Sequence, residues 1–351
     1  MSGILELARP DIRELQPYQH AAWDPGLERL HANEMPWRAS GDGSEAGLNR
    51  YPEPQPQALV ARLAELYGVP ASHVLVGRGS DEAIDLLARA FCRAGVDKVV
   101  TCPPTFGYYK VAARIQGAAV VEVPLRQPDF GLDADGVLAA AADAKIVFLC
   151  SPNNPTGNLL DRDAVVGIVR ALERTALVCV DEAYIEFSRE RGLAGLLTSL
   201  PNLVVLRTLS KAHALAGARC GTLLAQPAIV ELLKRIIPPY AIPTMTIEDV
   251  LRLTSAPART ETAARIDVLL GERERLRLGL EQCAAIEQVY PSDANFLLVR
   301  CRDAARVLAA GRGTGLLFRD FSAYPRLDRC LRISVGTPGQ NERLLAAVAR
   351  S

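Results

Sequence analysis

Residues 145–158 read KIVFLCSPNNPTGN, an apolar strand-like run followed by a polar turn, and this combination indicates the fold. It begins with a short run of apolar residues, β-branched and aromatic among them, which is typical of a strand buried on both faces. The run ends abruptly at Ser151, where a turn rich in Asn, Pro and Gly begins. A buried strand that ends in polar side chains favours an open α/β sheet, in which ligands bind beyond the carboxyl ends of the strands.

The same unit recurs along the chain. Strand-like runs occupy 98–102, 119–123, 176–180 and 203–207, and helical patterns occupy 57–67, 81–93, 105–116, 161–173 and 227–236. Short apolar strands that alternate with helices predict an α/β fold whose mainly parallel sheet is covered on both faces.

The pattern changes after a cluster of prolines between 238 and 243. A long charged helix is expected at 257–283, followed by strand-like runs at 295–300, 315–320 and 330–336. We therefore expect three parts: an N-terminal arm (1–30), a large domain (31–243) and a smaller C-terminal α/β domain (244–351). The arm contains several prolines, so we expect it to be irregular and to lie against a partner subunit.

Composition excludes several classes of function. The 351 residues are 49% apolar, and 40 basic residues balance 40 acidic ones, which argues against nucleic acid or an anionic membrane as the main partner. The N-terminus lacks the apolar core of a signal peptide, and no window approaches 18 uninterrupted apolar residues. Eight scattered cysteines without CxxC pairs predict free thiols. The sequence predicts a cytoplasmic protein, and it suggests no metal site.

The stretch LRTLSKAHALAGARCG (206–221) contains Lys211, one of only five lysines in the chain, among small residues. An amine in an apolar pocket has a lowered pKa and can attack an aldehyde. A surface lysine in a salt bridge is the alternative interpretation. The neighbouring Thr208, Ser210 and Arg219 favour the first, because two hydroxyls and a guanidinium suit a phosphate group.

A second phosphate-binding element is predicted at GRGSDEAIDLLARAFC (77–92). Its glycines permit a tight turn, and Ser80 and Asp81 begin a helix whose free amides can bind phosphate. An ordinary capped helix is the alternative, because GxGS occurs often by chance.

Four further residues suit a flat ring. Asp181 ends an apolar strand, and a protonated pyridine nitrogen would offset the cost of burying its carboxylate. Tyr184 and Asn154 follow strands and are able to donate to an oxygen on the same ring, and Tyr109 offers an aromatic face. Each also has an ordinary structural interpretation: Asp181 as a helix cap or salt-bridge partner, Asn154 as part of an Asn-Pro turn, and Tyr109 as a core residue. Together with the phosphate and amine groups they specify pyridoxal 5′-phosphate.

The chain resembles the fold-type I pyridoxal-phosphate-dependent aminotransferases and, more narrowly, the histidinol-phosphate aminotransferases. The resemblance runs nearly end to end through LQPYQHAAW, RLHANEMPW, NRYPEPQP, GRGSDEAIDLL, CPPTFGYY, SPNNPTGN, VDEAYIEF, TLSKAHALAGARCG, FRDF and CLRISVGT. The chain departs from that family at His213, which replaces a common aromatic residue, and at His31. The resemblance implies a large domain with a mainly parallel seven-stranded sheet, a smaller α/β domain and a homodimer with shared active sites.

The same resemblance implies roles for individual residues in the cofactor site. Lys211 attaches the cofactor and then moves a proton, Asp181 pairs with the pyridine nitrogen, and Tyr109 stacks on the ring. The ring oxygen is held by Asn154 and Tyr184. The cofactor phosphate is held by Ser80, Asp81, Thr208, Ser210 and Arg219, and by Tyr51 of the neighbouring subunit.

For the substrate, the resemblance implies a pocket formed by Tyr18, Asn33, Asn154, Arg319 and Arg332. Arg332 is expected to bind the α-carboxylate of glutamate, and the two arginines together suit the phosphate of histidinol phosphate. The implied activity is a ping-pong transfer of an amino group between glutamate or 2-oxoglutarate and the histidinol phosphate pair of histidine biosynthesis. Three alternatives stay open at this stage: an aromatic-amino-acid aminotransferase or threonine-phosphate decarboxylase on the same scaffold, a cofactor-binding regulatory module, and a structural α/β protein.

Overall fold

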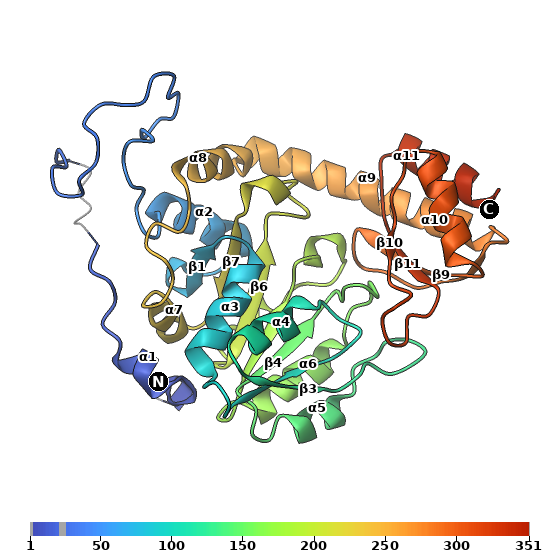
Figure 1. The fold of residues 1–351 in the computed structure, drawn as a ribbon, viewed down its shortest axis with the longest axis horizontal. Coiled ribbons are helices and arrows are strands. Elements are labelled where there is room, and N and C mark those ends of the chain that lie inside the picture. The colour runs from blue at the N-terminus through green and yellow to red at the C-terminus, as the bar shows by residue number, and fades with distance from the viewer. Residues whose placement is uncertain (1–2, 21–25, 351) are drawn as a thin grey trace.

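The computed structural model describes residues 3–20 and 26–350, and within these it contains two β-sheets of unequal size flanked by helices (Figure 1). The predicted α/β class is therefore confirmed. The long helix α9 (Ala256–Glu281) runs from the side of the large sheet to the small one.

The large sheet has seven strands in the order β1-β7-β6-β5-β4-β2-β3. The strands β2, β3, β4, β5 and β6 are parallel to one another, and β7 pairs antiparallel with both β6 and β1. The strands are β1 (Val74–Gly77), β2 (Lys98–Thr101), β3 (Ala119–Glu122), β4 (Ile146–Cys150), β5 (Leu177–Asp181), β6 (Leu203–Thr208) and β7 (Gly221–Leu224).

The six expected helices all form, with ends that shift by up to about three residues. They are α2 (Gln57–Tyr67), α3 (Ser80–Phe91), α4 (Tyr108–Ile115), α6 (Arg162–Ala171), α7 (Pro227–Leu233) and the long helix α9. Two further helices, α5 (Ala134–Ala140) and α8 (Thr244–Leu253), had no predicted range. Short 3-10 turns complete this part of the chain at η2 (Ala71–His73), η3 (Ile185–Phe187), η4 (Ala194–Leu196) and η5 (Ala216–Ala218).

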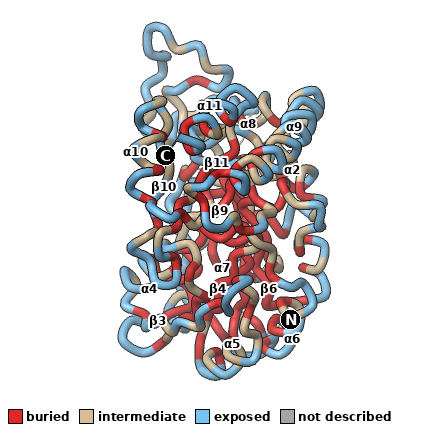
Figure 2. Tube along the Cα trace, turned by 90° about the vertical axis from the view of Figure 1, so that its right-hand side faces the viewer, coloured by how far each residue is buried: buried red, intermediate tan, exposed pale blue. Residues whose placement is uncertain are grey.

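Two hydrophobic cores lie on opposite faces of the large sheet. Alternate residues of β4 belong to different cores: Val147 and Leu149 pack with one, whereas Ile146 and Phe148 pack with the other. All five residues of β4 and of β5 are consequently buried. Figure 2 shows the tube around the label of β4 largely in the red of buried residues. This burial on both faces is the reason that these strands are continuous apolar runs in the sequence.

The small sheet is antiparallel, in the order β10-β11-β9-β8. Its strands are β8 (Ile286–Val289), β9 (Phe296–Cys301), β10 (Arg319–Asp320) and β11 (Cys330–Ser334), and α10 (Ala304–Gly313) and α11 (Pro338–Val348) complete it. A separate core joins these strands to α9. Helix α8 contacts both α2 and α9, so the exact boundary at 243 and 244 stays a prediction.

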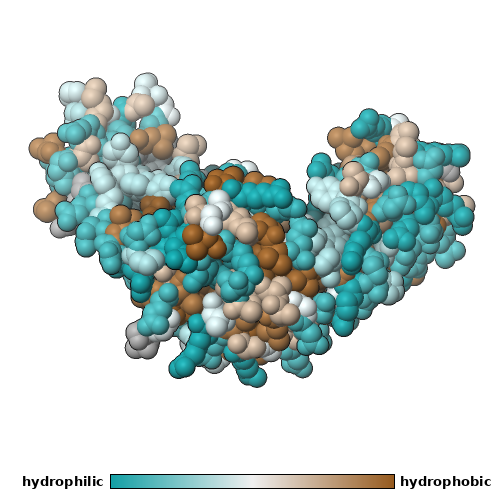
Figure 3. Space-filling view, turned by 60° about the horizontal axis from the view of Figure 1, so that its bottom comes forward, coloured by the Kyte–Doolittle hydropathy of each residue, from teal (hydrophilic) through white to brown (hydrophobic). Residues whose placement is uncertain are grey.

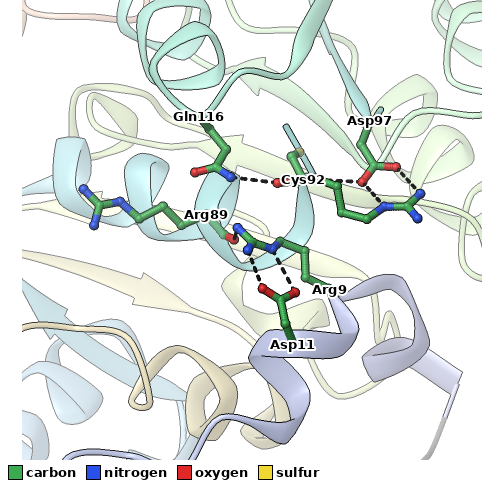
Figure 4. Close-up of polar contacts among 7 residues, drawn as sticks. Arg9, Asp11, Arg89, Cys92, Asp97 and Gln116 are labelled. Atoms are coloured by element: carbon green, nitrogen blue, oxygen red, sulfur yellow. Dashed lines mark hydrogen bonds and ion pairs between the residues drawn. The ribbon is translucent and has the colours of Figure 1, made fainter. Parts of the chain in front are cut away.

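The predicted irregular arm is wrong for its first part. Residues 3–14 form η1 (Gly3–Leu7) and α1 (Pro10–Glu14), and Ile4 and Leu7 are buried in a core of this same chain. Arg9 fixes the segment through an ion pair with Asp11 and a hydrogen bond to the carbonyl of Arg89 at the end of α3 (Figure 4). Ala8 is buried in the same core, and Leu5 and Ile12 pack against it, so apolar contacts hold a segment that its prolines suggested was irregular.

Strands β1, β7 and β8 have no counterpart among the predicted strands. The run at 315–320 forms a strand only at its last two positions. In the part of the chain that the structure describes, no helix combines the length and the apolar character that crossing a membrane requires.

Candidate active site

A cavity of about 880 Å³ lies where the carboxyl ends of β4, β5 and β6 approach the small sheet. The space-filling view shows a hollow between the main body and a projecting lobe, where hydrophobic and polar side chains meet (Figure 3). Eleven of the predicted site residues line this cavity: Ser80, Asp81, Asn154, Asp181, Tyr184, Thr208, Ser210, Lys211, Arg219, Arg319 and Arg332. Residues separated by up to 252 positions in the sequence thus meet in one place. The argument from strand ends predicted this for Asn154, Asp181, Tyr184 and Lys211, whereas Arg319 and Arg332 were implied by the family resemblance alone.

The N-terminus of α3 is a ready anion site. Its N-cap, Gly79, provides no side-chain hydrogen bond, so the first amides of the helix stay available. Gly79 has a φ of 93°, and a Cβ there would lie 2.8 Å from the guanidinium of Arg219. The hydroxyls of Thr208 and Ser210 lie 3.0 Å apart beside it. Only glycine allows helix amides, hydroxyls and a guanidinium to converge this closely.

Lys211 follows β6 and lines the cavity, with its side-chain nitrogen 5.6 Å from the centroid of the Tyr184 ring. Burial, and secondly the charge of Arg332, lower the pKa of this amine below its ordinary value. A lowered pKa increases the fraction of neutral amine near pH 7, which both nucleophilic attack and proton transfer require.

Asp181 ends β5 and is 3% exposed. Burial raises the pKa of its carboxyl to about 6, and hydrogen bonds from Tyr109 and from the amide of Ala183 oppose that rise. Among the described residues no cation forms an ion pair with this buried carboxylate, so a cationic ligand would offset the cost of its burial.

Tyr109 requires a correction. Its side chain is fully buried and stacks on Phe148 with ring centroids 5.0 Å apart, so it presents no face to the cavity. The reason is helical periodicity: Tyr109, Ala112 and Ala113 form the buried face of α4. The aromatic wall of the cavity is instead formed by Phe106 and Tyr108, which belong to the same CPPTFGYY motif.

Two arginines come to the cavity from the small sheet. Arg319 on β10 and Arg332 on β11 are directly paired across the strands, and no carboxylate forms an ion pair with either among the described residues. Both guanidiniums lie against the ring of Phe321, at 5.8 Å and 5.4 Å from its centroid, and Arg332 also donates to Asn154. Directly opposed like charges destabilise a sheet, and a bound dianion would relieve that repulsion.

Besides Tyr109, three predicted residues lie outside this cavity. Tyr18 and Tyr51 are exposed, at 67% and 50%, and Asn33 is exposed as well. Tyr51 stacks on Tyr240, with ring centroids 4.6 Å apart. All three belong to the extended segment that precedes α2, and their assigned contacts stay predictions.

The sequence analysis missed a buried ion cluster behind the cavity. Arg207, beside Thr208 on β6, pairs with Glu182 at 3.3 Å and with Glu186 at 2.7 Å. Glu182 follows Asp181 directly, so the cluster ties the end of β5 to the end of β6. Burial raises the pKa of Glu182 to about 7, although Arg207 opposes that rise. The available signal was the charged residues inside VDEAYIEF and LRTLSK, at the ends of otherwise apolar strands.

Comparison with known proteins agrees with this geometry. The family model described as aminotransferase class I and II matches residues 31–348. A histidinol-phosphate aminotransferase of Xanthomonas campestris pv. campestris is 46% identical, over 99% of this chain and 98% of the relative.

Two solved structures are similar over most of their length. A histidinol-phosphate aminotransferase from Sinorhizobium meliloti in complex with pyridoxal-5′-phosphate has a TM-score of 0.77 at 27% identity, covering 86% of this chain and 82% of that one. The enzyme of that name from Clostridium acetobutylicum has a TM-score of 0.79 at 20% identity, covering 86% and 90%. The chain therefore belongs to the class I and II aminotransferase family and, within it, to the histidinol-phosphate aminotransferases.

The ion cluster leads to a stability prediction. Replacing Arg207 by Met leaves the buried Glu182 and the partly buried Glu186 without their cation, and is expected to lower the free energy of unfolding by about 3–5 kcal/mol near pH 8. Because the raised pKa of Glu182 means that the folded chain binds more protons than the unfolded chain, stability falls as pH rises from about 4.5 through about 7. Without Arg207 that fall is steeper.

Urea unfolding at several pH values measures the effect, and Arg265→Met, which removes the exposed pair with Glu261 on α9, is the control. The control is expected to stay within about 0.5 kcal/mol of the wild type. A deficit of equal size near pH 5 and near pH 8 would contradict the role of the buried carboxyls.

Proposed function

We propose that this protein transfers an amino group between glutamate and imidazole-acetol phosphate, forming 2-oxoglutarate and histidinol phosphate, in histidine biosynthesis. The reaction is reversible, and the same site serves both half-reactions in turn. We further propose that pyridoxal 5′-phosphate is the cofactor and that the enzyme works in the cytoplasm as a homodimer.

The observation that carries the substrate assignment is the cross-strand pair of Arg319 and Arg332. A phosphate monoester carries up to two negative charges, and two guanidiniums match it better than one. Glutamate presents carboxylates to the same pair. An aromatic-amino-acid aminotransferase would have less use for a second unpaired arginine.

The residues of the cavity fit pyridoxal 5′-phosphate. The amides at the start of α3, with Thr208, Ser210 and Arg219, are suited to its phosphate, and Asp181 is suited to its ring nitrogen. Phe106, which lines the cavity, is suited to stack on the cofactor ring in place of Tyr109. When bound, this cofactor supplies an aldehyde for the amine and a ring that accepts an electron pair from the substrate carbon.

The side chains of the chain itself then have separate tasks. Lys211, with its lowered pKa, would remove the α-proton from the substrate and later return a proton. Asp181, as a carboxylate, would favour a protonated ring nitrogen. Arg332 and Arg319 would orient the anionic end of the substrate, and Asn154, which accepts a hydrogen bond from Arg332, would hold the ring oxygen.

The absorption spectrum of the purified protein with pyridoxal phosphate tests the activity. A visible band is expected, and it should fade when histidinol phosphate is added, because the amino group passes to the cofactor. A band that responds only to glutamate or to aromatic amino acids would exclude the proposed substrate, and release of carbon dioxide would favour a decarboxylase. Absence of any band would exclude the cofactor.

Replacing Arg319 by Leu tests the phosphate pocket. We expect kcat/KM for histidinol phosphate to fall about 100-fold, because one charge-assisted contact to a dianion is lost, and kcat/KM for glutamate to fall less than about tenfold. Steady-state kinetics of the two half-reactions measure both values. Arg306→Leu, an exposed residue of α10, is the control and should leave both unchanged. Equal losses for the two substrates would count against a phosphate role.

The proposed dimer is supported by the surface of the segment that precedes α2. Large apolar side chains are exposed along it, among them Leu27, Leu30, Met35, Trp37 and Tyr51. Such a concentration of exposed apolar groups is typical of an interface. A second copy of the chain that covers this segment would also bring Tyr51 to the neighbouring cavity.

Hybrid dimers test the shared site. Tyr51→Ala and Lys211→Ala variants are each expected to be nearly inactive, and refolding them together should restore activity, because a mixed dimer contains one site with both native residues. Each variant refolded alone is the control. No recovery in a mixture that sedimentation shows to be dimeric would place both residues in a single-subunit site.

A further inference from the structure

The hydroxyl of Tyr109 has a specific partner that core packing alone does not require. It donates a hydrogen bond of 2.8 Å to Oδ2 of Asp181, and the tyrosine side chain has no exposed surface. Its ring lies parallel to that of Phe148, with 3° between the planes. The aromatic ring therefore packs as a core residue, and only the hydroxyl reaches toward the cavity residues.

We propose that Tyr109 is a positioning residue for the reaction, which acts by holding the carboxylate of Asp181 in one orientation and in its ionised form. This inference rests on the proposed function, because the task of that carboxylate is to face a protonated ring nitrogen. In this proposal Tyr109 contacts neither substrate nor cofactor and affects the reaction only through Asp181.

The geometry supports an orienting role. Oδ1 of Asp181 accepts the amide hydrogen of Ala183 at 3.1 Å, and Oδ2 accepts the hydroxyl of Tyr109. The two donors come from different elements, the turn after β5 and the first turn of α4, so the carboxylate cannot rotate without losing both. Each oxygen keeps a second acceptor site for a ligand.

The surrounding charges explain why the hydroxyl matters. Burial favours the neutral carboxyl of Asp181, and the hydrogen bond from Tyr109 is the largest effect that opposes it. Asp81 on α3 also favours the neutral form, whereas Lys211 after β6 favours the charged one. The other ionisable groups packed around this carboxyl are the thiols of Cys150 and Cys179 and the phenol of Tyr184.

Tyr109 is not itself a proton carrier. Burial, and secondly the charge of Asp181, raise the pKa of its phenol well above the ordinary value, so it stays protonated wherever the protein is folded. Its O–H therefore remains a donor throughout the working pH range. A fixed neutral donor stabilises the anionic form of its partner without offering a competing charge.

The Tyr109→Phe variant removes the hydroxyl and keeps the stacked ring. With the holoenzyme, we expect the pH midpoint at which the visible band of the bound cofactor changes to rise by about half a unit to one unit. The reason is that a ring nitrogen less firmly protonated repels the proton at the Lys211 nitrogen less strongly. We expect kcat to fall about tenfold or more, and KM for glutamate to change less than about threefold.

Tyr290→Phe is the matched control, because Tyr290 is also buried but packs against Phe130 outside the cavity. It should leave the midpoint and kcat unchanged. Introducing Tyr109→Phe into an Asp181→Asn background supplies the second measurement. If the tyrosine acts through that carboxylate, the two changes together should cost little more than Asp181→Asn alone.

The outcomes separate the two proposals. Suppose that the wild-type protein shows the visible band. An unchanged pH midpoint in Tyr109→Phe, or additive losses of kcat in the double variant, would then overturn the role of Tyr109 and leave the proposed function intact. A wild-type protein that binds pyridoxal phosphate without any visible band would overturn the proposed function, and the role of Tyr109 with it.

Discussion

The cost of burying the carboxylate of Asp181 is the constraint on which the site depends. The residue ends the central strand β5 and is 3% exposed, where an unpaired charge is strongly disfavoured. Two neutral donors from separate elements hold it, and Lys211 is the cation whose field favours its charged form. Under the proposed function, the protonated ring nitrogen of the cofactor is the cation that completes this site.

The ends of β5 and β6 must keep their positions for this arrangement to work. Arg207 joins them through Glu182 and Glu186, and Glu182 lies between Asp181 and Ala183, which both line the cavity. One guanidinium shared by two carboxyls leaves some polar atoms unpartnered, including Oε2 of Glu186 and Nε of Arg207. Buried ion pairs seldom add net stability, so the main effect of this cluster is to fix the ends of β5 and β6 relative to each other.

The second sheet supplies what the first cannot. Strand ends of a parallel sheet offer hydroxyls, amides and an acid at one rim, and the substrate anion needs further positive charge. Antiparallel pairing of β10 with β11 puts Arg319 and Arg332 side by side at the mouth of the same cavity, against the ring of Phe321. Their mutual repulsion is a cost in the free chain that an anionic ligand removes.

The sequence by itself determined the α/β class, most strand and helix positions and most of the residues around the cavity. The strand positions followed because buried parallel strands are apolar throughout, and Asn154, Asp181 and Lys211 followed because the polar residues after such strands share one rim. Arg319 and Arg332 were implied only by the family resemblance. Tyr109 shows the limit: whether it or Phe106 faces the cavity depends on the direction of each side chain around the start of α4, which only the folded chain decides. The packing of Ile4 and Leu7, and the partners of Arg207, depended likewise on contacts between segments far apart in the sequence. Local pattern predicts which elements form, whereas the contacts between them depend on how the three-dimensional packing brings distant side chains together.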